Sequence, residues 1–209
     1  DGQYDVEIYS SKIRAVITGT DLKLGGETWG TCPDITVGTW EHFVVTWDGT
    51  NLNIYKNGIL AAYKTQSGNP VTNTDSVLIA RRLSAYDYDG NISNVAIWNS
   101  ALSEDQILTI YNGGVPNDIS SLSPISWWSL AGDSYYNGSN WICPDLGSAT
   151  NNGTGYGLAT TALIGDGPGS TLNGLAVNMN IPANLNGDAP NSTNNAFSVN
   201  MDTQSRVAV

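Results

Sequence analysis

The sequence predicts an all-β protein, in which an antiparallel sandwich with one short helix is followed by an extended arm rich in Asn and Gly. Three observations carry this prediction. Segments in the first half alternate polar and apolar residues, as half-exposed strands do. Turn-forming pairs such as Asn57-Gly58 separate these segments. A single helical pattern occurs near the middle of the chain, and large apolar residues become sparse beyond residue 160.

The strand patterns are clearest in the first eighty residues. Asp5–Tyr9 and Lys12–Thr18 alternate polar and apolar residues and predict a half-exposed hairpin. Trp40–Trp47 is the strongest strand pattern, and the hairpin turn at Asn57-Gly58 follows it after one more strand. Val77–Arg81 predicts a further strand.

A strand followed by a helix is predicted between residues 89 and 114. Residues 92–98 are rich in β-branched and aromatic side chains, which favour a strand. Ser103 is a suitable N-cap, and Gln106 stands at the capping-box position three residues later. Gly113 is placed to end the helix in a left-handed conformation. Because a helix of about two turns is marginal alone, we expect its apolar face to pack on the neighbouring sheet.

These two stretches resemble one known family. The segment from Trp40 to Leu60 has the laminin-G-like pattern of Trp, His, alternating Val, an aromatic residue, Asp-Gly and then a strand ending in Asn-Gly. The strand and capped helix of Asp89–Gly114 resemble the closing segment of laminin-G-like, or concanavalin-A-like, jelly-roll domains. The resemblance covers about residues 1–116 and implies a jelly-roll sandwich there. The strands that open such domains are missing before Asp1.

Residues 117–160 are predicted to form a Trp-rich linker or strand segment. Ile125–Thr154 resembles the opening of the same family, with an aromatic strand, a Gly- and Asn-rich loop and an Asn-Gly-Thr turn. It could begin a second copy of the domain, or complete the sheet of the first domain or of a neighbouring subunit by strand addition. It could also be a linker that packs against the domain.

Residues 161–209 contain two repeats and are predicted to form an extended arm. The stretch starting at Gly165 recurs 22 residues later at Gly187, and the register is kept at Val177 and Val199. Each repeat has too few large apolar residues to bury a core alone, so we expect an assembly or docking arm, with disorder as the alternative. The extension Ile125–Val209 is similar to Asn-rich C-terminal regions on laminin-G-like proteins of marine bacteriophages.

The charge and cysteine content of the chain limit the classes of partner and the covalent cross-links that we expect. The net charge is −11, and the only basic residue after Arg82 is Arg206. Nucleic acid and anionic membranes are therefore excluded as expected partners, and no apolar run has the length of a membrane span. Cys32 and Cys143 allow at most one disulfide, and two buried free thiols are an equal alternative.

Catalysis is not expected. His42 is the only histidine, and no reactive Ser or Cys motif accompanies it, so a nucleophile–base pair has little support. Glucanases that share this fold place several carboxylates on one face of a strand. Asp5 and Glu7 have this alternation but lack a third acid. We predict that the protein is not an enzyme.

Two kinds of binding site remain as expectations, and both follow from the resemblance. Family members hold Ca²⁺ at a sheet rim through Asp and Asn oxygens, and the candidate ligands are Asp48, Asp87, Asp89 and Asn91. Solvated turn carboxylates are the alternative reading of the same residues. The candidate glycan-stacking residues lie in predicted loops and are Trp29, Tyr86 and Tyr88, with a partial core role as the alternative.

The predicted function is that of a non-catalytic structural protein on a virion surface or appendage. Such a protein would assemble with copies of itself or other virion proteins through its C-terminal arm, and would bind cell-surface glycans through its loops. The alternative is a secreted or cell-surface lectin module that binds carbohydrate with the help of Ca²⁺. Both place the protein on the virion surface or in the extracellular space.

Overall fold

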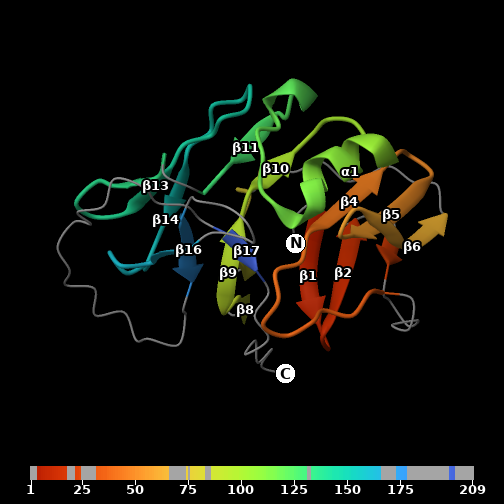
Figure 1. Cartoon of the computed structure of the whole chain (residues 1–209), viewed down its shortest axis with the longest axis horizontal. Helices are drawn as coiled ribbons and strands as arrows, with labels where there is room; N and C mark the ends of the chain where they lie inside the picture. The colour runs from red at the N-terminus through yellow and green to blue at the C-terminus, as the bar shows by residue number, and fades with distance from the viewer. Residues whose placement is uncertain are drawn as a thin grey trace.

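The protein is described by a computed structural model in which two groups of strands lie side by side and helix α1 covers part of the first group (Figure 1). The structure describes residues 4–17, 22–24, 32–65, 74, 76–82, 86–130, 133–165, 173–177 and 198–200. Nearly all regular structure in this part of the chain is antiparallel β-strand, which confirms the predicted all-β class.

The first group is a sandwich of two three-stranded sheets. One sheet contains β1 (Tyr4–Tyr9), β2 (Lys12–Ile17) and β3 (Leu22–Leu24), and the other contains β4 (Phe43–Trp47), β5 (Asn51–Lys56) and β6 (Ile59–Thr65). Alternation along the strands turns one set of apolar side chains inward from each sheet. The resulting buried cluster includes Ile13, Ala15 and Ile17 of β2, Leu52 and Ile54 of β5, and Ala62 of β6.

Helix α1 (Glu104–Tyr111) packs on the outer face of the second sheet. Ser103 caps it, and the predicted capping box with Gln106 is present in both directions. Ile107 is fully buried in a cluster with Tyr55 of β5. Gly113 has the predicted left-handed conformation at the helix end, with a φ of 67°, and the C-cap residue Asn112 before it is left-handed as well, with a φ of 44°. The short 3₁₀ turn η2 (Asn112–Gly114) follows.

The hairpin turn at Asn57-Gly58 has the predicted geometry, with φ values of 52° and 79°. A Cβ atom on Gly58 would lie 3.0 Å from side-chain atoms of both Leu108 and Tyr111 of α1. Glycine is therefore required here for the turn and for the close approach of the helix.

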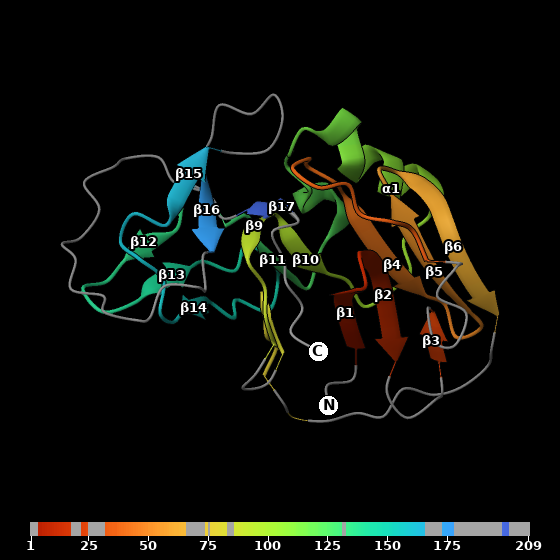
Figure 2. The same ribbon diagram turned by 90° about the horizontal axis from the view of Figure 1, so that it is seen from below.

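The second group contains strands from before and after the helix and lies beside the first group. Figure 2 shows it beside the sandwich, with β9 and β10 between the two. Four of its strands precede helix α1, namely β7 (Arg81–Arg82), β8 (Tyr86–Asp87), β9 (Gly90–Ser93) and β10 (Val95–Ile97). Four more follow it, namely β11 (Ser126–Trp128), β12 (Tyr135–Tyr136), β13 (Trp141–Cys143) and β14 (Gly153–Gly155). The 3₁₀ turn η3 (Ser120–Leu122) precedes β11. The buried cluster consists of Ile92, Trp128, Leu130, Trp141, Cys143 and Ala162.

Strand β11 pairs with β10 of the same chain, and β10 leads directly into Trp98, which packs in the cluster between α1 and the sandwich and so connects the two groups. Trp128 lies opposite Val95, and Trp127 lies opposite Ala96. Ile125–Thr154 thus places one strand beside β10 of the same chain, in a two-stranded sheet that is separate from the two sheets of the sandwich.

A buried carboxylate organises the loop after β13. Asp145 accepts hydrogen bonds from the backbone N–H groups of Trp127, Gly147 and Asn151 at 2.8–2.9 Å. Burial opposes the charged form, but these hydrogen bonds outweigh it and lower the pKa of Asp145. A Cβ atom on Gly147 would lie 2.3 Å from the carbonyl oxygen of Ile125, so the loop approaches β11 too closely for any other residue.

Strands from the two C-terminal repeats pair with β9 on opposite edges. The sheet has the order β15 (Leu163–Gly165), β16 (Asn173–Val177), β9, β17 (Ser198–Asn200). Val177 lies opposite Gly90, and Val199, which occupies the equivalent position in the second repeat, lies opposite Ile92. The other residues of both repeats beyond Gly165 lie outside the described residues.

Two sequence predictions are corrected or resolved. The strand predicted at Val77–Arg81 is wrong for most of its length, because only Arg81 is in a strand. Ala80 has a φ of 63°, which interrupts the extended backbone, and Val77 and Leu78 are exposed. Cys32 and Cys143 are free and buried, each in a different core cluster.

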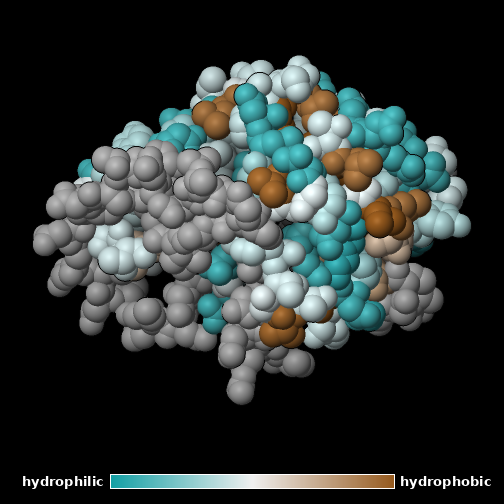
Figure 3. Space-filling model, in the orientation of Figure 1, coloured by the Kyte–Doolittle hydropathy of each residue, from teal (hydrophilic) through white to brown (hydrophobic). Residues whose placement is uncertain are grey.

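The described surface shows no extended apolar area in the view of Figure 3, where the brown patches are separated by teal and white residues. No helix in the described part of the chain has the length and apolar character needed to cross a membrane.

Candidate functional site

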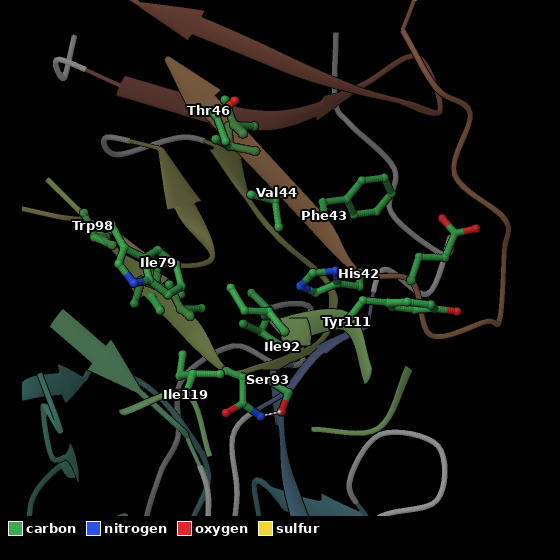
Figure 4. Close-up of a pocket in the computed structure, with 18 of the residues that line it drawn as sticks. His42, Phe43, Val44, Thr46, Ile79, Ile92, Ser93, Trp98, Tyr111 and Ile119 are labelled. Atoms are coloured by element: carbon green, nitrogen blue, oxygen red, sulfur yellow. Dashed lines mark hydrogen bonds between the residues drawn. The ribbon is translucent and has the colours of Figure 1, made fainter. Parts of the chain in front are cut away.

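A cavity of about 820 Å³ lies where the sandwich meets the second group of strands (Figure 4). Its walls come from β1, from residues 40–47 including β4, from residues 77–81, from β9 and β10, and from residues 110–119 after the helix. The volume is within the usual range for ligand pockets. The wall is mostly apolar and aromatic, and a small number of polar groups lie in it.

His42 is the most unusual polar residue of the wall. It directly precedes β4, and its ring stacks on Tyr111 with the ring centres 5.8 Å apart. Figure 4 shows the two rings side by side, with Ile92 and Val44 next to them. Burial lowers the pKa of His42 to about 4, so the ring is neutral at physiological pH. Its Nδ1 atom is buried and has no hydrogen-bond partner among the described residues.

A second polar atom of the wall is also without a partner. The side-chain Nδ2 of Asn117 donates to the backbone carbonyl of Thr109 at 3.1 Å, but the Oδ1 atom is buried and unpaired among the described residues. Since buried polar atoms are normally hydrogen-bonded to protein or to ordered water, these two atoms are the places in the wall where water or a polar group of a ligand can form a hydrogen bond.

Two carboxylates of the wall form ion pairs with basic residues. Glu41 is buried, and its Oε1 lies 2.7 Å from Nζ of Lys56. Glu7 forms an ion pair with Arg14 of the neighbouring strand. Both carboxylates thus have basic partners, and the unpaired Nδ1 of His42 shows no hydrogen bond to a carboxylate among the described residues.

Of the three residues predicted to stack on glycans, the structure describes the side chain of Tyr88 alone. Tyr88 lines the cavity and packs partly against the second core, in line with the alternative reading of a partial core residue. A Cβ atom on Gly90 would lie 2.4 Å from its hydroxyl oxygen, so the ring lies across this glycine. Tyr86 begins β8, and its side chain lies outside what the structure describes. Trp29 lies outside the described residues.

The four predicted calcium ligands fall into two groups. Asp48 lies in the β4–β5 turn, where its Oδ1 accepts hydrogen bonds from the N–H groups of Thr50 and Asn51. These bonds lower the pKa of Asp48 and occupy its oxygens in the turn. Asp87, Asp89 and Asn91 lie at or between β8 and β9. No group of three or more acidic, His or Cys side chains suited to a metal occurs among the described residues. The calcium site stays a prediction.

The cavity itself was not foreseen from the sequence. His42 and Tyr111 are 69 residues apart in the numbering, and nothing in either local pattern shows that their rings stack. The alternation did place His42 on the face opposite Phe43, and that is the face on which α1 packs. Asn117 begins the segment predicted as a Trp-rich linker or strand, and nothing in that prediction singled it out as a site residue.

Comparison with known proteins gives one match. Residues 1–108, just over half of the chain, match the family model described as the concanavalin A-like lectin/glucanases superfamily. No curated protein and no solved structure matches the chain.

Proposed function

The chain belongs to the concanavalin A-like lectin/glucanases superfamily, and from this premise we propose that it is a non-catalytic structural module of a virion or cell surface that assembles through its C-terminal repeats. Membership of this superfamily supports a carbohydrate-binding or structural module in general. The observation that favours assembly is the pairing of β16 and β17 with the two edges of β9.

The pairing supports assembly because it uses main-chain hydrogen bonds. Overlapping segments of the two repeats pair antiparallel with opposite edges of one strand, with registers that differ by two residues. A repeat from a neighbouring copy would offer β9 the same main-chain groups, so exchange between copies needs no new contact surface. Most of the first repeat is also uncharged, since residues 167–187 contain no acidic or basic side chain. Charge repulsion between chains of net charge −11 is therefore smallest there.

The experiment that tests this proposal is a deletion series measured by light scattering. Removing residues 188–209 deletes the second repeat, and removing residues 166–209 deletes both. We expect the full chain to form a defined assembly, the first deletion to reduce its mass and the second to give a folded monomer. Far-UV circular dichroism checks folding of each variant. An assembly of unchanged mass after the second deletion would refute the proposal.

Carbohydrate binding is the second candidate, favoured by the family and by Tyr88 at the cavity wall. It predicts saturable binding on a glycan array, reduced by Tyr88→Ala and, where calcium takes part, by a chelator. Because this readout does not depend on the mass of the particle, the two candidate functions can be tested separately. A blank array with and without Ca²⁺ would exclude this candidate.

A further inference from the structure

The three-stranded sheet of β12, β13 and β14 has a buried inner face. The register places Tyr136 opposite Trp141, and Trp141 opposite Gly155. Trp141 is fully buried, and Tyr136 packs partly against the same core. A Cβ atom on Gly155 would lie 3.2 Å from Cβ of Trp141 and 2.7 Å from Leu158, whose side chain packs against this core. This row of residues therefore defines the inner face of the sheet.

The neighbouring row of residues forms the outer face, because side chains alternate along a strand. It contains Tyr135, Ile142 and Thr154, which are paired in register across the three strands. Tyr156 stands two residues after Thr154, directly beyond the end of β14, and so continues the outer face. Tyr135 and Tyr156 are 54% and 74% exposed, whereas Ile142 on the strand between them is half-buried. The outer face thus presents one aliphatic side chain flanked by two exposed tyrosine rings.

The geometry of the sheet sets the spacing of the two tyrosines. Tyr135 and Tyr156 lie two strand spacings apart, which corresponds to about 9.6 Å, and two residues apart along the strand direction, which corresponds to about 6.8 Å. Their Cα atoms are therefore about 12 Å apart. A ligand that contacts both rings at once must be elongated, so a compound with one small ring does not account for the pair.

The stretch of chain that carries the two rings is almost uncharged. Residues 134–165 contain one charged side chain, that of the buried Asp145. Asp133, just before this stretch, accepts a hydrogen bond of 2.6 Å from a serine hydroxyl. Hydroxyl and amide side chains take the place of charges, and Asn137 and Ser139 in the β12–β13 turn are exposed. Phosphate groups find no lysine or arginine in this stretch, and the net charge of −11 repels them, so a neutral ligand with hydrogen-bonding groups is favoured over a nucleic acid.

We propose that the outer face of β12, β13 and β14 binds a neutral oligosaccharide across Tyr135 and Tyr156. The face of an aromatic ring is negative, and the C–H groups on the apolar side of a pyranose ring pack on such a face. The hydroxyl groups at the edge of the pyranose exchange hydrogen bonds with hydroxyl and amide side chains. An oligosaccharide is elongated and presents such a ring at every unit, so two of its rings can rest on the two tyrosines at once.

The face is poor in the groups that a protein partner would need. The core of a protein–protein contact is apolar, and between the two rings the face offers only Ile142, which is already half-buried. Figures 1 and 2 place the sheet on the side of the second group that is away from the sandwich. The site lies outside residues 1–108, which match the superfamily, and uses neither the cavity nor the C-terminal repeats. The inference therefore rests neither on assembly through the repeats nor on Tyr88.

The test uses isothermal titration calorimetry with the full-length protein and three neutral probes, namely cellohexaose, laminarihexaose and maltohexaose. All three are glucose chains, because the equatorial hydroxyl groups of glucose leave its ring faces to C–H groups, and they differ in linkage geometry. We expect saturable binding of at least one hexasaccharide. Glucose alone should bind at least tenfold more weakly, since it can contact only one tyrosine. Binding of none of the hexasaccharides, or equal binding of glucose, would overturn the proposal.

Matched variants locate the site. Tyr135→Ala and Tyr156→Ala each remove one exposed ring, and we expect each to weaken binding at least fivefold. Tyr156→Phe keeps the ring and should change the affinity less than threefold. Tyr63→Ala removes a ring of similar exposure, 66%, from β6 of the sandwich, and Tyr88→Ala removes the ring in the cavity wall, so neither should change the affinity more than twofold. Binding that is lost in Tyr88→Ala and kept in Tyr135→Ala would assign the oligosaccharide to the cavity and overturn the proposal.

Chemical modification of the unaltered protein tests whether the outer face is open. Tetranitromethane nitrates exposed tyrosine rings, and mass spectrometry locates the modified residues. We expect Tyr135 and Tyr156 to be nitrated in the free protein and to be protected at least fivefold by the bound hexasaccharide, with no protection of Tyr63. If neither Tyr135 nor Tyr156 were nitrated in the free protein, another part of the chain or a second copy would cover the face, and the proposal would be overturned.

Discussion

The two cores of the molecule are built on different principles. The core of the sandwich is aliphatic, with side chains such as Ile13, Leu52 and Ile54 that have no polar atoms. The second core is built around Trp128 and Trp141, and both indole N–H groups donate to backbone carbonyls. The first core therefore depends on volume and shape alone. The second also depends on polar groups that must find their partners inside the protein.

The largest expected effect is in the second core. Trp141 is fully buried, and its indole donates to the carbonyl of Ala159 at 2.9 Å. We expect Trp141→Ala to lower the free energy of unfolding by about 3–5 kcal/mol, measured by urea denaturation followed by circular dichroism. Ile54→Val in the first core should cost only about 0.5–1.5 kcal/mol. A loss below about 1 kcal/mol for Trp141→Ala would contradict the view that the second core is tightly packed.

Two substitutions that both conserve side-chain volume, one in each core, distinguish the polar requirement of the second core from the apolar packing of the first. Asp145→Asn keeps the shape but places an amide against the backbone donors of Trp127, Gly147 and Asn151. We expect a loss of about 1–3 kcal/mol in the free energy of unfolding. Leu52→Met, which also conserves volume, should cost less than about 1.5 kcal/mol.

The pH dependence of the free energy of unfolding tests the role of Asp145 in the native protein. Because the pKa of Asp145 is lowered in the folded state, its contribution to stability is present above the unfolded value and is lost as the pH falls through the folded value. We therefore expect the free energy of unfolding to fall less with decreasing pH in Asp145→Asn than in the native protein. If Asp145→Asn had the same acid denaturation profile as the native protein, Asp145 would not contribute to the loss of stability at low pH.

The third prediction concerns His42 and pH. Its pKa is lowered from 6.5 to about 4 because the buried ring resists protonation. The unfolded chain therefore binds a proton at higher pH than the folded chain, and the contribution of His42 is complete above pH 6.5 and declines as the pH falls towards 4. We expect His42→Phe, which keeps a ring against Tyr111, to remove this slope in urea denaturation between pH 6.5 and 4.5. Since His42 is the only histidine, a slope that persists in the variant would be inconsistent with this assignment.

The smallest expected effect tests the helix that covers the sandwich. Ser103→Ala removes the cap that accepts from the N–H of Gln106. It should lower the free energy of unfolding by about 1 kcal/mol. Ser100→Ala, at an exposed position, should change it by less than about 0.5 kcal/mol. Similar losses in both variants would mean that the cap contributes nothing specific.

The sequence predicted the sandwich well because its signals are local. Alternation in Lys12–Thr18 and the pair Asn57-Gly58 specify strands and turns within a few residues. The cap at Ser103 is equally local. Val77–Arg81 failed because an apolar run does not show that the backbone turns at Ala80.

The second core and the cavity could not be predicted in the same way. Asp145 reads as an ordinary loop carboxylate until the fold brings Trp127 to it from 18 residues away. The stacking of His42 on Tyr111 likewise depends on how α1 packs on the sheet. The predicted domain boundaries at residues 116 and 160 stay predictions, as do the calcium and glycan residues.

The measurement that tests the account most directly is amide exchange at the junction of the two cores. The N–H of Ile125 donates to the carbonyl of Ile97 at 2.8 Å, and the N–H of Asn94 donates to the carbonyl of Ser129 at 3.1 Å. If β11 belongs to the same structure as the sandwich, both amides will exchange only through large-scale opening, as slowly as Ile54. Exchange of both at the rate of the exposed turn at Gly138 would show that the β10–β11 pairing does not hold the two cores together.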